Sequence, residues 1–431
     1  MSAKQTQSTI IQNITQLREY LQVALKLEHA TIPPYLTTAY TAKLESNKPS
    51  VDILRAVAKE EMLHLLLVGN LLNAVGGTPD LTSDDFVPSY PTHLPTGDTT
   101  FEVNIERFSH AAIETFLKIE RPTQRPRDVG AVEHVTSAVP IQGADLDKSI
   151  RESPKPLVPV EKKEDGNYQL HYDVLMIPHD KLSPKRQQKA TKSFLPAVQA
   201  TDTEGNEVEL HYWSIGEFYQ AISLGFVELS KIMPRKKLFC GDSKRQIGSI
   251  SYYSGGGHAH EVTDLKSALA ALELIAGQGE GYNNEVYDAE NEIAHYYRFD
   301  QIRQGRYYRV PDKYGKNGDD PGKPQGGKFP VDMKAVYPIK ANAKIADYDG
   351  NPELVENALL FNGQYKDFLG LLNDGFNGKP ELLDPRTGAF AKAMFQIKVA
   401  MERLIHVPIP GNDENASPTF EMNRCKSPST I

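Results

Sequence analysis

A carboxylate and an imidazole stand three residues apart, at Glu61 and His64, inside an otherwise apolar run. In an α-helix of about 3.6 residues per turn they share one face with the apolar positions Leu54, Val57, Val68, Leu71 and Val75. Burying both groups without partners would cost several kcal/mol. A metal ion satisfies both at once, because Glu and His at i and i+3 point the same way. The alternative is a core pair satisfied by hydrogen bonds, or a helix turned so that both groups meet water.

The same spacing recurs far along the chain, at Glu292 and His295, again on an apolar stripe if the segment is helical. Glu28 continues the apolar face of a predicted first helix. Two Glu-x-x-His pairs together with single inward glutamates are the ligand set with which a four-helix bundle holds two metal ions. The sequence therefore predicts a dinuclear centre whose ligands include Glu28, Glu61, His64, Glu292 and His295.

That ligand set needs one further glutamate, and three residues compete for the role. Glu280 lies near the end of the helix before Glu292, where a tight turn would bring the two together, and it is the favoured ligand. Glu120 ends a short helix and stays an alternative. Glu217 is least favoured, because its spacing from Ser214 is that of a capping box, which already explains it.

Composition narrows the class of protein. The chain has 431 residues and a formal net charge of −8, which argues against a nucleic-acid-binding surface. Only Cys240 and Cys425 are present, far apart, so a disulfide scaffold, a cysteine zinc site and a cysteine-ligated iron–sulfur cluster are excluded. We find no signal-peptide pattern and no apolar stretch of about 18 residues, so we expect a cytoplasmic protein without a membrane partner.

Helix and strand signals give the expected elements. Caps and apolar periodicity predict helices at about 14–45, 50–75, 108–120, 214–231, 263–281, 286–304, 352–376 and 386–405. Pro33 and Pro34 are expected to bend or break the first helix. Two strand-like runs, at 168–177 and 207–212, predict a small β element.

These elements predict a mainly α fold. We expect a helical bundle over 10–305, interrupted by an irregular or β-containing insertion at about 122–212. A loop-rich segment at 306–431 should follow, with two extra helices that pack on the bundle.

Several segments together resemble a known family. They are Glu28-His-Ala-Thr-Ile-Pro-Pro-Tyr35, Glu61-Met-Leu-His64-Leu, Asn70-Leu-Leu-Asn-Ala-Val-Gly-Gly77, Ile119-Glu120-Arg-Pro, Gly216-Glu-Phe-Tyr219, Gln278-Gly-Glu280-Gly and His295-Tyr-Tyr-Arg-Phe299. The chain resembles the ferritin-like family of iminophenylpyruvate dimer synthases, which also occurs as a region of the large bisindole-forming enzymes of violacein and rebeccamycin biosynthesis. The resemblance runs from about 15 to 305 and through the tail at 418–421.

The resemblance implies a ferritin-like bundle and the oxidative coupling of imines derived from aromatic 2-oxo acids. The larger enzymes are associated with haem, and the residues here leave haem open without assigning it a ligand. The mixed oxygen and imidazole ligand set suits iron or manganese, and iron is the choice that the resemblance implies. This chain is much shorter than those enzymes, so functions of their other regions need not carry over.

We therefore expect a non-haem dinuclear-metal oxidoreductase of specialised metabolism. Its partners would be an amino-acid-derived or aromatic small molecule, and dioxygen or peroxide. A metal-storage or ferroxidase protein and a non-catalytic ferritin-like scaffold are the alternatives, and a homo-oligomer stays open. The aromatic residues nearest the expected ligands in sequence could line a substrate pocket, although aromatics at helical spacing are more often core: Tyr20, Tyr35, Tyr282, Tyr296 and Phe299.

Overall fold

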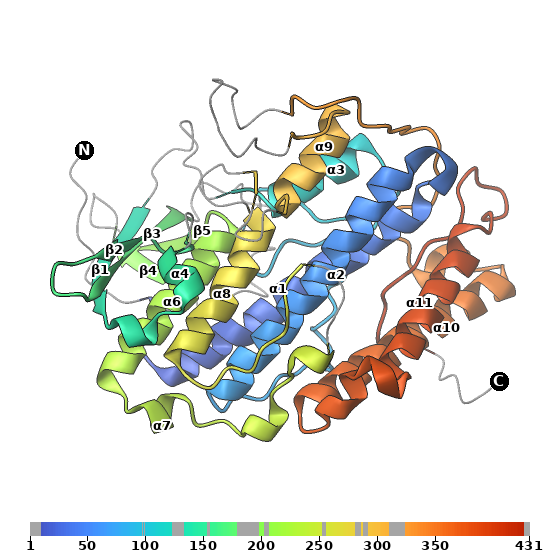
Figure 1. Cartoon of the computed structure of the whole chain (residues 1–431). Coiled ribbons are helices and arrows are strands. Elements are labelled where there is room, and N and C mark those ends of the chain that lie inside the picture. Colours follow the sequence, from blue (N-terminus) through green and yellow to red (C-terminus); the bar gives the residue numbers. More distant parts are fainter. Residues whose placement is uncertain are drawn as a thin grey trace.

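Four long helices form the central bundle of the computed structural model (Figure 1). The structure describes residues 10–96, 98, 100–122, 133–152, 156–178, 198–201, 207–251, 256–280, 286–287, 292–309 and 324–425. Helix α1 (Ile14–Thr41) packs along α2 (Leu44–Ala74), and α6 (Ile215–Ile232) packs on α1 and on α8 (Leu265–Glu280). Contacts between α8 and α2 close the bundle.

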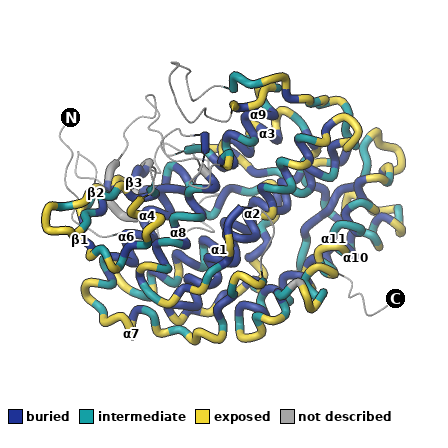
Figure 2. The backbone as a smooth tube through the Cα atoms, in the orientation of Figure 1, coloured by how far each residue is buried: buried dark blue, intermediate teal, exposed yellow. Residues whose placement is uncertain are grey.

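Apolar faces and caps explain why these segments are helical. Leu17, Leu21 and Leu25 are fully buried on α1, and the Asn13 side chain caps that helix by accepting from the Gln16 amide. The interiors of α1 and α2 are buried over most of their length, whereas the short helix α7 (Arg235–Leu238) is largely exposed (Figure 2). The bundle core is therefore continuous around the segments that carry the predicted ligands.

Helix α1 runs unbroken through Pro33 and Pro34, so the expected break does not occur. A proline removes the amide that would bond to the carbonyl four residues earlier, so Pro34 leaves the carbonyl of Ala30 without its helical donor. The hydroxyl of Tyr90 donates to that carbonyl at 3.0 Å. A side chain from another segment thus replaces the missing helical bond.

Two other helix boundaries differ from the predictions. Helix α2 begins at Leu44 rather than Ser50 and is kinked at Asn47, where the backbone leaves the helical region just before Pro49. The helix expected at 286–304 begins only at His295, giving α9 (His295–Gln304). An antiparallel bridge pairs Tyr287 with Ile293, and Val286, Tyr287 and Ala294 are buried outside any helix.

Helices α3 (His110–Ile119) and α9 pack against each other at one end of the bundle, and α9 also contacts α2 and α8 (Figure 1). The Ser109 side chain caps α3, in agreement with the helix predicted at 108–120. This pair brings two further segments to the middle of α2.

A five-stranded antiparallel sheet occupies the insertion, next to α6 and α8 (Figure 1). Its strands are β1 (Glu133–Ile141), β2 (Val160–Lys162), β3 (Tyr168–Pro178), β4 (Val198–Thr201) and β5 (Glu207–Tyr212), in the order β1-β3-β5-β4 with β2 also pairing with β3. The two predicted strands are β3 and β5. Strands β1, β2 and β4 were not predicted; β1 is an edge strand, where its Pro140 is tolerated.

The sheet and the C-terminal helices are both attached to the bundle. The Tyr212 hydroxyl of β5 donates to that of Tyr20 on α1 at 2.9 Å. Helices α10 (Pro352–Phe376) and α11 (Ala389–Ile405) pair with each other and contact α2 and α1, close to the predicted ranges. The remaining short elements are α4 (Lys148–Glu152) and 3₁₀ turns at Gly143–Asp145, Ser243–Arg245, Ser249–Ser251, Ile345–Tyr348, Pro380–Leu383 and Pro385–Thr387. None of the described helices is both long and apolar enough to cross a bilayer.

Candidate metal centre

Five buried side chains from four elements meet inside the bundle. They are Glu28 of α1, Glu61 and His64 of α2, Glu120 at the C-terminal end of α3, and His295 at the start of α9. They form two groups of three, Glu28–Glu61–His64 and Glu61–Glu120–His295, and in each group the candidate ligand atoms lie within 4.8 Å of one another. We call these five residues the paired site. Glu61 belongs to both groups, which is the arrangement expected of a bridging carboxylate.

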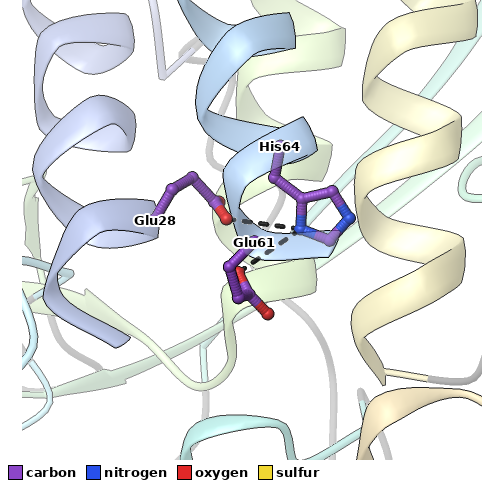
Figure 3. A group of neighbouring side chains, drawn as sticks. All are labelled: Glu28, Glu61 and His64. Carbon is purple, nitrogen blue, oxygen red and sulfur yellow. Dashed lines mark ion pairs between the residues drawn. The ribbon is translucent and has the colours of Figure 1, made fainter. Parts of the chain in front are cut away.

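The first group is shown in Figure 3, where Glu28 and Glu61 approach the same edge of the His64 ring. His64 Nδ1 lies 3.4 Å from Glu28 Oε2 and 3.4 Å from Glu61 Oε2. The other oxygen of Glu28 accepts a hydrogen bond from the hydroxyl of Tyr219 on α6. Helices α1, α2 and α6 thus supply the side chains on the Nδ1 side of His64. Helix α8 supplies Gln278, whose side-chain amide bonds to the other ring nitrogen, Nε2.

The second group has the same plan. His295 Nδ1 lies 2.9 Å from Glu61 Oε1 and 3.6 Å from Glu120 Oε2. The other oxygen of Glu120 accepts from the hydroxyl of Tyr35 at 2.5 Å. A buried phenol therefore orients one carboxylate in each half.

Both imidazoles are held through Nε2, away from the carboxylates of the paired site. His64 Nε2 bonds to Gln278 Oε1 at 3.0 Å, and His295 Nε2 bonds to Glu60 Oε2 at 2.7 Å. Because both partners are acceptors, Nε2 carries a proton in each ring, so loss of the second ring proton leaves the Nδ1 lone pair facing the carboxylates. This is the tautomer that a metal-binding histidine needs.

The residues of the paired site fit a metal pair. His295 is fully buried, and its Nδ1 forms no aligned hydrogen bond among the described residues although Glu61 Oε1 lies 2.9 Å away, so the carboxylate and the imidazole face each other as two ligands of one ion would. Carboxylate oxygens and imidazole nitrogens are the donors that iron, manganese and zinc accept. Three carboxylates and two histidines would hold two ions, with coordination positions left for exchangeable ligands.

In the metal-free chain, protons bound to Glu28 and His64 reduce the negative charge of the buried carboxylates. Burial raises the pKa of Glu28 to about 8, with His64 opposing the rise. Burial alone would lower the pKa of His64, but Glu61 and Glu28 outweigh it and raise that pKa to about 10. The pKa of Glu61 is well below its usual range, because the two histidines outweigh the effect of burial. Metal binding would release the protons held here.

The other predicted ligands are placed differently. Glu292 precedes α9, its side chain is 47% exposed, and it pairs with Arg298 at 3.1 Å, so its expected place on one helical stripe with His295 is wrong. Glu280 is the last residue of α8, but its side chain and all of Tyr282 lie outside the described residues. Glu217 is buried and forms the predicted capping box with Ser214. Among the competing glutamates that can be placed, Glu120 is the one at the centre.

Sequence reasoning missed Glu60, which binds His295 and also accepts from Arg298 Nη1 at 2.9 Å. It lies one residue before Glu61 and so faces a different direction on α2. The apolar stripe that identified Glu61 and His64 therefore does not include Glu60. The available signal was Arg298, three residues after His295 and so on the same helical face, because a guanidinium beside a buried histidine needs a carboxylate partner.

The predicted pocket aromatics divide into two sets. Tyr35 reaches the paired site through Glu120, and Phe299 packs on the Tyr35 ring at 5.2 Å. Tyr20 instead stacks on Phe218 between α1 and the sheet, so it is part of the core. Tyr296 is half-buried against Tyr297. Tyr35 is thus the predicted aromatic that makes polar contact with the centre.

Comparison with known proteins agrees with this fold. The model of the Ferritin-like family matches residues 21–304, so the chain belongs to the ferritin-like family. Dichlorochromopyrrolate synthase from Lentzea aerocolonigenes is 25% identical over 381 residues, covering 86% of this chain and 29% of that enzyme. The chain therefore spans less than a third of the length of that relative. A crystal structure of a ferritin-like protein from Caulobacter vibrioides shares the fold, with a TM-score of 0.50 and 20% identity over 91% of this chain and 95% of that one. The expected family resemblance and mainly α fold are confirmed.

Proposed function

We propose that the paired site binds two metal ions, iron or manganese, and that the chain is an oxidoreductase acting on an aromatic or amino-acid-derived small molecule. The observation that carries this proposal is the sharing of Glu61 between two groups, each completed by a histidine whose Nδ1 faces the carboxylates. When held there, two redox-active ions would supply electrons for the reduction of dioxygen or peroxide while an organic substrate is oxidised.

The chain's own residues would prepare the centre for that chemistry. Gln278 and Glu60 orient the two imidazoles, while Tyr219 and Tyr35 orient Glu28 and Glu120. The five residues of the paired site are at most 3% exposed, so bulk water is excluded and charge interactions are stronger than at a surface. Proton release from His64 and Glu28 on metal loading would leave both side chains able to coordinate.

The substrate class rests on similarity. The relative from Lentzea aerocolonigenes is a synthase, and 86% of this chain aligns with 29% of that enzyme. We propose an imine derived from an aromatic 2-oxo acid as the substrate, oxidised or coupled in specialised metabolism.

The test is oxidant dependence. Iron-loaded chain is mixed anaerobically with an imine generated from an aromatic amino acid, and then exposed to dioxygen or peroxide. We expect oxidant consumption and a new product only after exposure, and neither in a Glu61→Gln variant. Full product formation under anaerobic conditions would refute the oxidoreductase assignment, and an unchanged rate in Glu61→Gln would refute the paired site as its location.

A further inference from the structure

The two halves of the paired site differ in what lies behind their histidines. His64 donates from Nε2 to the neutral amide of Gln278 at 3.0 Å, whereas His295 donates to the carboxylate of Glu60 at 2.7 Å. Both rings are at most 2% exposed, so bulk water does not compete for either bond. The shorter bond has the charged acceptor, as expected of a charge-assisted hydrogen bond.

The charge behind His295 extends beyond Glu60. Arg298 donates to the other oxygen of Glu60 at 2.9 Å, and it also pairs with Glu292 at 3.1 Å. The guanidinium therefore lies on the oxygen of Glu60 that faces away from His295, and the oxygen that faces the ring keeps its charge-assisted bond. Behind His64 the contact is an amide without charge.

This difference has a consequence for metal affinity. A carboxylate that accepts from the far nitrogen of an imidazole makes the ligating nitrogen a stronger donor, and loss of such a partner typically weakens metal binding by about 10- to 100-fold. An amide acceptor fixes the ring but adds little donor strength. The orienting phenols do not offset the difference, because each half has one, Tyr219 on Glu28 and Tyr35 on Glu120.

We infer that the two metal positions are inequivalent: the Glu61–Glu120–His295 position binds the first divalent ion tightly, and the Glu28–Glu61–His64 position binds the second more weakly. Glu60 and Gln278 are the positioning residues that set this order. The inference rests on the proposed dinuclear function and adds to it a defined order of loading.

The experiment is a titration of the metal-free chain with Mn²⁺, in which free Mn²⁺ is measured from its electron paramagnetic resonance signal. The wild-type chain should bind two ions in steps separated by about 10- to 100-fold. His64→Ala should retain the tight step, and His295→Ala should retain only the weak one. Binding of fewer than two ions by the wild type would overturn the dinuclear centre and this inference with it. Two ions bound with equal affinity, or the opposite result in the histidine variants, would overturn the inference alone.

Glu60→Gln keeps the shape and a hydrogen-bond acceptor but removes the charge. It should weaken the tight step by about 10- to 100-fold and leave the weak step in place. Glu292→Gln is the matched control, because it removes the other carboxylate on Arg298 and should change neither step. Gln278→Glu should strengthen the weak step, a gain that a misfolded variant cannot produce. An unchanged tight step in Glu60→Gln, or a Glu292→Gln effect of equal size, would overturn the inference.

Discussion

At the scale of single residues, the paired site places ionisable groups where a core would ordinarily hold apolar ones. Glu61 and His64 are almost fully buried at 3% and 2% exposure, yet each has several polar neighbours and His64 is held by Gln278. The metal-free arrangement is therefore tolerated through proton sharing, and it is poised to exchange protons for metal. This reasoning gives two predictions about particular side chains.

Replacing His64 by Ala should reduce bound metal from two ions per chain to about one. The surrounding apolar face of α2 remains, so far-ultraviolet circular dichroism should show nearly unchanged helix content. Metal is measured by elemental analysis after loading with iron and removal of free ion. Two ions retained by a folded variant would contradict the assignment of His64 as a ligand.

Glu120 and Glu292 provide a direct comparison between the ligand placed by the structure and the one expected from spacing. Glu120→Gln should perturb the absorption spectrum of the cobalt-loaded chain, because its carboxylate lies 3.6 Å from His295 Nδ1. Glu292→Gln should leave that spectrum unchanged, since its side chain is 47% exposed and lies outside the paired site. The reverse pattern would return the ligand role to Glu292.

At the scale of elements, α6 begins at a buried capping box that also titrates. Glu217 accepts from the Ser214 amide at 3.0 Å and is 2% exposed. Burial raises its pKa to about 7, with the Ser214 hydrogen bond opposing the rise. The folded chain thus holds a proton on Glu217 that the unfolded chain releases at lower pH.

A carboxyl group whose pKa is higher in the folded chain than in the unfolded chain stabilises the fold while it holds its proton. For Glu217 this contribution to the free energy of unfolding is complete below the unfolded pKa of about 4.5, and it is lost as the pH rises through about 7. The metal-free wild type should therefore lose stability between pH 5 and pH 8, with Glu217 contributing on the order of 3 kcal/mol. Glu217→Gln, which cannot titrate, should show a smaller loss across the same interval. Thermal melts of both chains in chelator at the two pH values test this. Parallel losses in the two chains would show that the proton is not held at Glu217.

At the scale of the whole molecule, the paired site joins elements that are far apart in the chain. Its five side chains come from α1, α2, the end of α3 and the start of α9, so a bound metal would connect the bundle with the α3–α9 pair. A ligand that binds only the folded state stabilises it by mass action, by about 2.7 kcal/mol at one hundred times the dissociation constant.

The metal-loaded chain should accordingly melt at a higher temperature than the chelated chain. The Glu292→Gln variant should show the same rise, because its substitution lies outside the paired site. A Glu61→Gln variant should lose most of the rise, since Glu61 contributes to both groups. Differential scanning calorimetry with and without Mn²⁺ measures all three. An equal rise in Glu61→Gln would show that the ions bind elsewhere.

The sequence alone determined the parts of this protein that depend on local spacing. Glu61 and His64 lie on one helix, so the helical repeat brings them together wherever that helix packs, and Glu28 continues an apolar face in the same way. Helix α10 and strands β3 and β5 follow from caps and alternation, which also act over a few residues.

Tertiary structure decided which distant groups complete the centre. Glu120 reaches it because α3 packs on α9 at the end of the bundle, and Glu60 becomes the partner of His295 because α9 contacts α2. Glu292 lies outside the paired site because α9 begins at His295, too late to carry both residues on one helical face. Spacing within one helix is set by the backbone itself, whereas contacts between elements depend on how whole apolar faces pack, and no local pattern records that choice.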